Sequence, residues 1–178
     1  GSGAEYLYGM LVQLLGRDNI FGLESPSYEK IQAVYEANGA QCALLTLDEE
    51  GISPAALWAS QAKILHVTPF HSYPTNITAP VSRRLEYLRW ASDRDGIIIE
   101  DDFASEFLLR GKPLETVFQL DTQGRVIYLN TFSKSLAPSI RMGYMVLPQQ
   151  LMEEYRRRLG FYSCTVPVFD QKVLAEFI

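Results

Sequence analysis

Cysteine is scarce in this sequence: the 178 residues include only two, Cys42 and Cys164. Two cysteines cannot build a disulfide framework, and without paired histidines they make a poor zinc site, so we expect neither kind of stabilisation. Long apolar runs are also missing. Because no run approaches the ~18 residues that span a bilayer and no signal peptide opens the chain, we expect a soluble cytoplasmic protein without a membrane partner.

Positive charge is not in excess either. The 16 Lys+Arg residues and 21 Asp+Glu residues give a net charge of -5. This balance argues against a broad nucleic-acid-binding surface on this segment, although a basic domain can lie elsewhere in a longer protein. The sequence opens on Gly1 and stops inside the apolar, helix-like stretch Val173–Ile178. We therefore expect residues 1–178 to form one domain cut from a longer chain.

Short apolar runs alternate with amphipathic stretches along the whole sequence. Several runs are apolar on consecutive positions, as in Ile97–Ile99, and a strand covered on both faces needs that pattern. The expected strands are Ile20–Glu24, Ala43–Leu47, Lys63–Thr68, Gly96–Glu100, Arg125–Asn130 and Gly143–Leu147. The expected helices are Ala4–Leu15, Ser27–Asn38, Pro80–Arg94 and Leu151–Leu159. This alternation predicts an α/β fold, a three-layer α/β/α sandwich with a mostly parallel sheet.

The clearest expected helix is Pro80–Arg94. Its apolar stripe consists of Val81, Leu85, Leu88 and Ala91. Because Arg83 and Arg84 lie off this stripe, we expect them to face solvent. Thr78 is the expected N-cap, with Pro80 in the first turn.

Ligands in such folds bind beyond the carboxyl ends of the strands, so the segments that follow the strands are the places to search. The run Glu100-Asp101-Asp102 follows one apolar strand. Three successive carboxylates repel one another unless each has a different partner. A solvated turn or the start of a helix, where carboxylates are favoured, is the simpler interpretation of this run.

A second polar segment follows the strand Arg125–Asn130 and contains a single lysine, Lys134, among hydroxyl residues, with Arg141 seven positions later. A lysine near another cation can lose its proton and attack a carbonyl, and arginine binds phosphate with a planar fork. An exposed loop lysine and a surface arginine are the alternative.

Weaker signals accompany these two segments. Gly3 opens a helix, where backbone N–H groups can face an anion. Tyr28 can cover a flat ligand or belong to the core. His66 is expected to be a hydrogen-bonded core histidine, whereas His71 lies in a loop rich in proline.

Taken together, these segments supply the parts that hold pyridoxal 5′-phosphate: an anion cradle, an aromatic ring, a carboxylate, a lysine and an arginine. The sequence resembles the large domain of fold-type I aminotransferases and, among them, the aminotransferase-like half of MocR-type bacterial regulators of the GntR superfamily. The resemblance covers essentially the whole chain. The motifs that carry it are Ser2–Leu7, Glu24–Tyr28, Thr68–Thr75, Glu100–Phe107 and, most specifically, Ile127–Tyr144.

The resemblance implies a role for each matching residue. Lys134 would bond covalently to the cofactor aldehyde, Asp101 would pair with the pyridine nitrogen, and Tyr28 would stack on the ring. The residues implied to surround the phosphate are Gly3, Ala4, Glu5, Thr131, Ser133 and Arg141. His71 and Tyr73 would approach the hydroxyl side of the ring.

Two positions depart from the family pattern. The family usually has Tyr where this sequence has Phe103, so the hydrogen bond to the phenolic oxygen of the cofactor is missing or comes from another residue, and its loss would argue against efficient transamination. The family also has Gly where this sequence has Asn76. Because Asn accepts a positive φ better than most residues, we expect the turn to be retained.

Three functions remain open at this point. The first is a domain of a transcription regulator that senses an amine or amino acid as a homodimer and reaches DNA through an N-terminal winged helix outside this segment. The second is a true aminotransferase, completed by a C-terminal small domain. The third is a dimerisation scaffold that has lost its cofactor. The joint presence of Asp101, Lys134 and Arg141 argues against the third.

Overall fold

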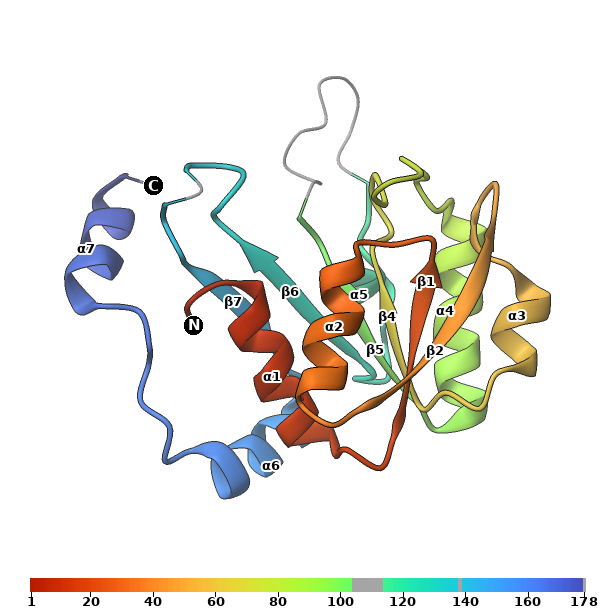
Figure 1. The fold of residues 1–178 in the computed structure, drawn as a ribbon, viewed down its shortest axis with the longest axis horizontal. Coiled ribbons are helices and arrows are strands. Elements are labelled where there is room, and N and C mark those ends of the chain that lie inside the picture. Colours follow the sequence, from red (N-terminus) through yellow and green to blue (C-terminus); the bar gives the residue numbers. More distant parts are fainter. Residues whose placement is uncertain (104–113, 138, 178) are drawn as a thin grey trace.

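The computed structural model describes residues 1–103, 114–137 and 139–177 and contains, within these ranges, a seven-stranded sheet in the order β3-β2-β1-β4-β5-β6-β7 (Figure 1). The strands are β1 Ile20–Ser25, β2 Gln41–Asp48, β3 Gly51–Ile52, β4 Ile64–Val67, β5 Ile97–Asp101, β6 Val126–Thr131 and β7 Gly143–Val146. Five strands are parallel, and only the edge strands β3 and β7 run antiparallel to their neighbours. The mostly parallel sheet confirms the prediction.

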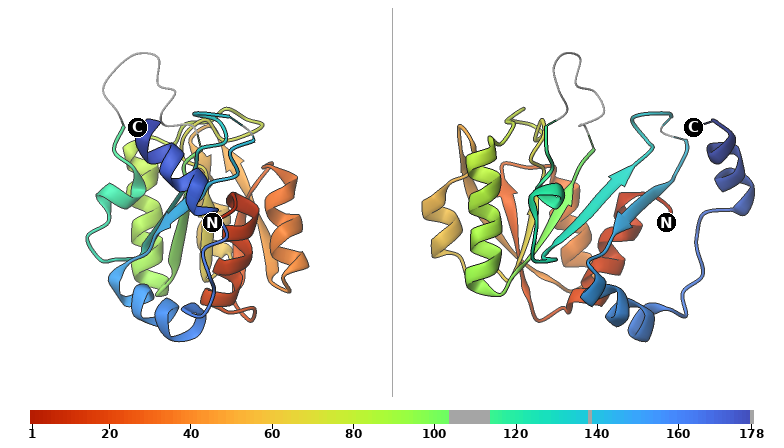
Figure 2. Two further views of the ribbon diagram at one scale, coloured as in Figure 1. Left: turned by 90° about the vertical axis from the view of Figure 1, so that its left-hand side faces the viewer. Right: turned by 180° about the vertical axis from the view of Figure 1, so that it is seen from behind.

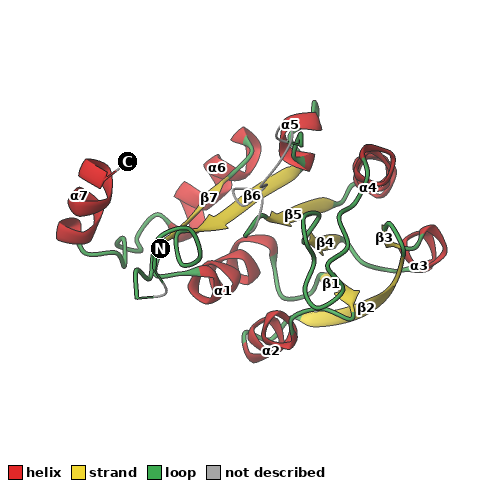
Figure 3. Ribbon diagram, turned by 90° about the horizontal axis from the view of Figure 1, so that it is seen from above, coloured by secondary structure: helices red, strands yellow, loops and turns green. Residues whose placement is uncertain are grey.

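Helices cover both faces of this sheet (Figures 2 and 3). Their bounds are α1 Ala4–Leu15, α2 Glu29–Ala37, α3 Pro54–Ala59, α4 Val81–Arg94, α5 Val117–Leu120, α6 Gln149–Leu159 and α7 Val168–Phe177. Helices α1 and α2 lie on one face, and α3, α4 and α5 lie on the other (Figure 3). The predicted three-layer sandwich is therefore confirmed.

One apolar core fills each side of the sheet. The first joins α1 and α2, through residues such as Leu11 and Tyr35, to the strand residues Phe21 and Ile127. The second joins α3, α4 and α5 to the opposite face of the same strands. Because side chains of a strand alternate between its faces, the consecutive apolar positions of β5 serve both cores: Ile99 enters the first core and Ile98 the second.

The predicted stripe of helix α4 is right at Leu88, which packs against the second core, and at the buried Ala91, but wrong at Val81 and Leu85. The buried residues of this helix are Arg83, Arg84, Tyr87, Trp90 and Ala91, whereas Val81 and Leu85 are exposed. The arginines are buried because they have partners: Arg83 bonds Asp48 and the carbonyl of Ile52, and Arg84 bonds the carbonyl of Glu115. The predicted N-cap is also wrong: the N-cap is Pro80, and the Thr78 hydroxyl accepts the N–H of His71.

The C-terminal segment leaves the sandwich. Helix α6 packs against α1, where Met10, Leu14 and Leu159 form a small third core. Helix α7 lies apart from the sheet, beyond a long connection (Figures 1 and 2), and none of its described residues is buried. None of the helices in the described ranges is long and apolar enough to cross a membrane.

Candidate functional site

The carboxyl ends of four neighbouring strands meet at one edge of the sheet. Glu24, Asp101 and Thr131 lie at the ends of β1, β5 and β6, and Thr68 directly follows β4. Beside them is a cavity of about 320 Å³. Its lining residues are Ala4, Tyr8, Ser27, Tyr28, Ile31, Thr68, Tyr73, Asp101, Phe103, Thr131 and Lys134. Seven of the twelve residues proposed from the sequence therefore share this cavity: Ala4, Tyr28, Tyr73, Asp101, Phe103, Thr131 and Lys134.

Aromatic rings form much of the cavity wall. The rings of Tyr28 and Tyr73 meet edge to face, with their centroids 6.1 Å apart. The Lys134 Nζ lies 3.9 Å from the centroid of Phe103. An aromatic face attracts a cation, so Phe103 holds the exposed Lys134 side chain at the cavity although it has no hydroxyl to offer.

Asp101 is buried among three side chains that the sequence did not place in the site. Its Oδ2 accepts a hydrogen bond from the Tyr8 hydroxyl and lies 3.5 Å from the His66 Nε2. The His66 Nδ1 is 2.7 Å from the Tyr35 hydroxyl. Within the described ranges, His66 Nε2 has no hydrogen-bond partner. His66 is thus a core residue, as predicted, but it is not fully hydrogen-bonded, and its Nε2 lies 3.5 Å from the Asp101 carboxylate that the resemblance pairs with the pyridine nitrogen.

The three successive carboxylates have three different sets of partners. Glu100 accepts the N–H groups of Val117 and Phe118 at the start of α5, each at 2.8 Å. The Asp102 Oδ2 accepts the Tyr128 hydroxyl at 2.8 Å. Since Asp101 faces the cavity and its neighbours on either side face other elements, their mutual repulsion is reduced. The run is not a solvated turn, because all three side chains are buried.

Burial raises the pKa of Glu100 from its ordinary value of 4.5 to about 7. Between these two values the folded protein holds a proton that the unfolded chain releases, so stability falls as the pH rises through this interval. We expect the parent to lose about 3 kcal/mol of unfolding free energy between about pH 5 and about pH 8 through this group, and Glu100→Gln to show a flatter profile. Urea unfolding at both pH values, with the exposed Glu29→Gln as control, measures this. Parallel profiles for parent and Glu100→Gln would contradict it.

A second buried carboxylate joins two of the loops that surround the cavity. Glu24 accepts hydrogen bonds from the backbone N–H and hydroxyl of Thr68 and from the hydroxyl of Ser72. Burial raises its pKa. Because Tyr28 lies four residues after Glu24 and Tyr73 directly follows Ser72, these bonds fix the spacing of the two aromatic walls.

The remaining proposed residues lie beside the cavity or away from it. Arg141 lies against the N-terminus of α1: a Cβ added to Gly3, whose φ is +85°, would come 3.1 Å from the Arg141 Nη2. Glu5 accepts a hydrogen bond from the same guanidinium. The Ser133 hydroxyl lies 3.5 Å from the carbonyl of Ile140, at the limit of a hydrogen bond.

His71 does not line the cavity. Its Nδ1 lies 3.1 Å from the side-chain oxygen of Asn76. Asn76 has a φ of 59°, the positive φ that was expected of asparagine at this position. Of the sequence motifs, residues 104–107 and Pro138 lie outside the described ranges.

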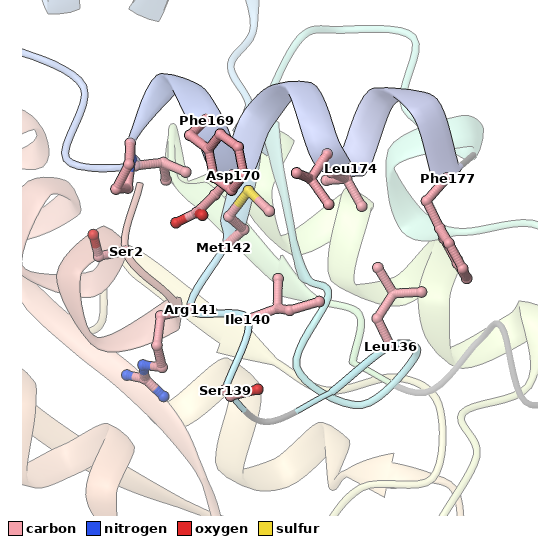
Figure 4. A pocket seen from close by; sticks show the side chains of 13 residues that line it. Ser2, Leu136, Ser139, Ile140, Arg141, Met142, Phe169, Asp170, Leu174 and Phe177 are labelled. Carbon is pink, nitrogen blue, oxygen red and sulfur yellow. The ribbon is translucent and has the colours of Figure 1, made fainter.

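A larger cavity, of about 590 Å³, lies between α7 and the loop that follows Lys134. Its walls are mainly apolar, with Leu136, Ile140, Phe169 and Leu174 among the lining residues (Figure 4). The guanidinium of Arg141 points away from helix α7 in this view. Arg141 is therefore turned toward Gly3 and Glu5.

Sequence analysis did not assign to the site the lining residues Tyr8, Ser27, Ile31 and Thr68, nor His66 and Tyr35, which lie behind Asp101. Thr68 belongs to the motif Thr68–Thr75. Its position directly after an apolar strand could have placed it in the site. Tyr8 carried no such signal, because an aromatic residue inside an amphipathic helix usually belongs to the core. Its role as a partner of Asp101 becomes visible only when α1 is placed against β5.

The architecture is that of fold-type I aminotransferases. The crystal structure of kynurenine aminotransferase from Pyrococcus horikoshii, in complex with PMP, matches with a TM-score of 0.86 and 30% sequence identity, over 100% of this chain and 46% of that one. No protein-family model matches the chain.

Sequence relatives narrow this class. The uncharacterized HTH-type transcriptional regulator YdeL of Bacillus subtilis is 36% identical over 178 residues, 100% of this chain and 38% of that protein. The probable rhizopine catabolism regulatory protein MocR of Rhizobium meliloti is 32% identical over 165 residues, 93% of this chain and 34% of that protein. The chain thus spans less than two fifths of either relative. These matches confirm its similarity to the aminotransferase-like domain of MocR-type regulators.

Proposed function

We propose that this chain binds pyridoxal 5′-phosphate and is the effector-sensing, aminotransferase-like domain of a bacterial transcription regulator. One observation carries the cofactor part of the proposal: Tyr28, Asp101 and Lys134, which lie at or after the ends of three different strands, line one cavity. The similarity to regulators over the whole chain supports the regulatory part. The aminotransferase structure held with PMP, the amine form of this cofactor, supports the choice of ligand.

The residues at the site fit this cofactor. At the start of α1, the absence of a side chain at Gly3 leaves the backbone open toward the Arg141 guanidinium, as a phosphate group requires. At the opposite end, the Asp101 carboxylate suits a protonated ring nitrogen. When bound, the cofactor supplies a reactive aldehyde and an electron-withdrawing ring.

The side chains of this chain would act as follows. Tyr28 stacks on the ring, and Thr131 and Ser133 complete the phosphate shell with the backbones of Ala4 and Glu5. Asp101 holds the proton on the ring nitrogen, and Tyr8 fixes the orientation of that carboxylate. Lys134 would hold the cofactor covalently, because its primary amine can combine with an aldehyde with loss of water. Phe103 offers no hydroxyl to the phenolic oxygen, which supports sensing rather than efficient transamination.

We further propose that the longer protein carries an N-terminal winged-helix domain and a C-terminal small domain and works in the cytoplasm. The length of the regulator relatives supports both additional domains. With a net charge of -5, this domain itself is poorly suited to DNA, so contact with DNA is assigned to the winged helix. The proposed effector is an amine or an amino acid, because an aldehyde cofactor, when bound, would supply a group that combines with an amine.

The intact protein is proposed to be a homodimer. Large apolar side chains are exposed on and before α7, with Phe161 at 76%, Phe169 at 75% and Phe177 at 71% of their full exposure, and apolar surface of this kind marks protein interfaces. We expect the double variant Phe169→Ser/Phe177→Ser to lower the molar mass measured by light scattering from dimer toward monomer. A dimer that persists at micromolar concentration would contradict this assignment.

Titration of the purified protein with pyridoxal 5′-phosphate, followed by visible absorbance, tests the cofactor. A saturable yellow species supports the proposal. A protein that stays colourless would favour a dimerisation scaffold that does not bind the cofactor. In the full-length regulator, DNA affinity should then change when the cofactor and a candidate amine are added. Sustained conversion of an amino acid to its keto acid, with no effect on DNA binding, would favour the aminotransferase instead.

A further inference from the structure

The phosphate end of the proposed site contains a carboxylate of its own. Glu5 lies in the first turn of α1, two residues after the N-cap Gly3. Its Oε2 accepts a hydrogen bond from the Arg141 Nη2, and its Oε1 lies 3.0 Å from the Lys30 Nζ. A carboxylate in this place is also favoured by the partial positive charge of the helix N-terminus. Glu5 therefore makes the contacts that an anionic ligand would make.

Glu5 is ionised at neutral pH. The hydrogen bond from Lys30, and to a lesser degree the hydrogen bond and charge of Arg141, hold the pKa of its carboxyl below its ordinary value. The three side chains carry one negative and two positive charges, so they present a single net positive charge to a phosphate. Without the carboxylate the same site would present two.

We infer that the Glu5 side chain weakens phosphate binding by competing for Arg141, and so keeps the cofactor exchangeable. This inference rests on the proposed function and deepens it. A guanidinium that already donates hydrogen bonds to a carboxylate has fewer N–H groups free for phosphate. The negative charge of the carboxylate also repels the phosphate dianion. The backbone of Glu5 would bind the phosphate while its side chain opposes it.

Lys30 connects this end of the site to the aromatic wall. Its Nζ lies 5.8 Å from the centroid of the Tyr28 ring and also bonds Glu5. If phosphate displaces Glu5 from Arg141, the carboxylate keeps Lys30 as its partner. Lys30 is therefore expected to ease the displacement, and Lys30→Gln should weaken binding of pyridoxal 5′-phosphate.

The test compares two ligands that differ only in phosphate. Dissociation constants for pyridoxal 5′-phosphate and for pyridoxal are measured by visible absorbance in the parent and in Glu5→Gln, which keeps the shape of the side chain and removes its charge. We expect Glu5→Gln to bind pyridoxal 5′-phosphate about tenfold more tightly, with little change for pyridoxal. Inorganic phosphate should also displace the phosphorylated ligand more effectively from this variant than from the parent.

The matched control is Glu154→Gln, which removes one carboxylate from an ion pair with Arg157 on α6. It changes the net charge equally and should leave both dissociation constants unchanged. If the parent binds pyridoxal 5′-phosphate and Glu5→Gln binds it no more tightly, the role of Glu5 is overturned and the proposed function stands. If parent and Glu5→Gln both fail to bind it, the proposed function itself is overturned.

Discussion

Replacing Lys134 by alanine is expected to abolish the covalent attachment of pyridoxal 5′-phosphate. In the parent, borohydride should fix one cofactor per chain on the peptide that contains Lys134, and mass spectrometry of a digest locates that mass. Lys134 is the lysine whose amine lines the cavity, and the imine to the aldehyde needs a primary amine. Because the side chain is exposed, the variant should fold as the parent does.

Lys63→Ala is the control for this experiment. Lys63 bonds the carbonyl of Arg94 at the other end of the sheet, far from the cavity. The control should retain the borohydride-fixed mass on the Lys134 peptide. Equal labelling of the parent and Lys134→Ala would show that the aldehyde reacts with surface amines and would contradict the assigned role.

Replacing Asp101 by asparagine is expected to weaken pyridoxal 5′-phosphate binding by about 100-fold, because truncating one member of a buried charge pair costs several kcal/mol. The amide is nearly isosteric with the carboxylate but cannot hold a proton on the ring nitrogen by its charge. The amide nitrogen would also face the donor hydroxyl of Tyr8 if it took the position of Oδ2. Absorbance titration measures the loss, and circular dichroism checks the fold.

Asp95→Asn serves as the matched control. Asp95 is an exposed carboxylate paired with Arg125, and it lies at the end of α4 with a φ of 50°, a conformation that asparagine tolerates. The Asp95→Asn variant should bind the cofactor with the same affinity as the parent. A dissociation constant for Asp101→Asn within twofold of the parent would mean that the carboxylate does not meet the ring nitrogen.

The sequence predicted the main elements because their hydrophobic patterns are long. Helix α1 begins and ends where it was expected, at Ala4 and Leu15, and each of the six expected strands is present with its ends shifted by no more than two residues. The short elements were missed. Strand β3 has two residues and α5 has four, too few for a period to show, and tertiary contacts such as the bonds from Glu100 stabilise α5.

The error in the predicted stripe of α4, at Val81 and Leu85, has a tertiary cause. Periodicity assigns arginine to solvent, but Arg83 finds Asp48 and the carbonyl of Ile52 on the neighbouring sheet edge, and Arg84 lies over the ring of Phe70. A long side chain can enter a core when it is hydrogen-bonded and packed there. The local sequence does not show which distant residues will be its partners. With both arginines inward, Val81 and Leu85 turn outward.

The site was predictable to the extent that its residues follow strands. Asp101 and Thr131 end β5 and β6, and parallel neighbours bring them together. The side chains that surround Asp101 could not be predicted. They are Tyr8, Tyr35 and His66, which lie on separate elements and look like ordinary core residues in the sequence. The same holds for the contact of Glu5 with Arg141, two residues 136 positions apart that meet only in the folded chain.

The most direct test of the account is a crystal structure of the protein grown with pyridoxal 5′-phosphate. We predict electron density for the ring between Tyr28 and Asp101, continuous with the side chain of Lys134, and for the phosphate between the start of α1 and Arg141. Density confined to the larger cavity beside α7, or no density in a crystal grown with saturating ligand, would contradict the central claim.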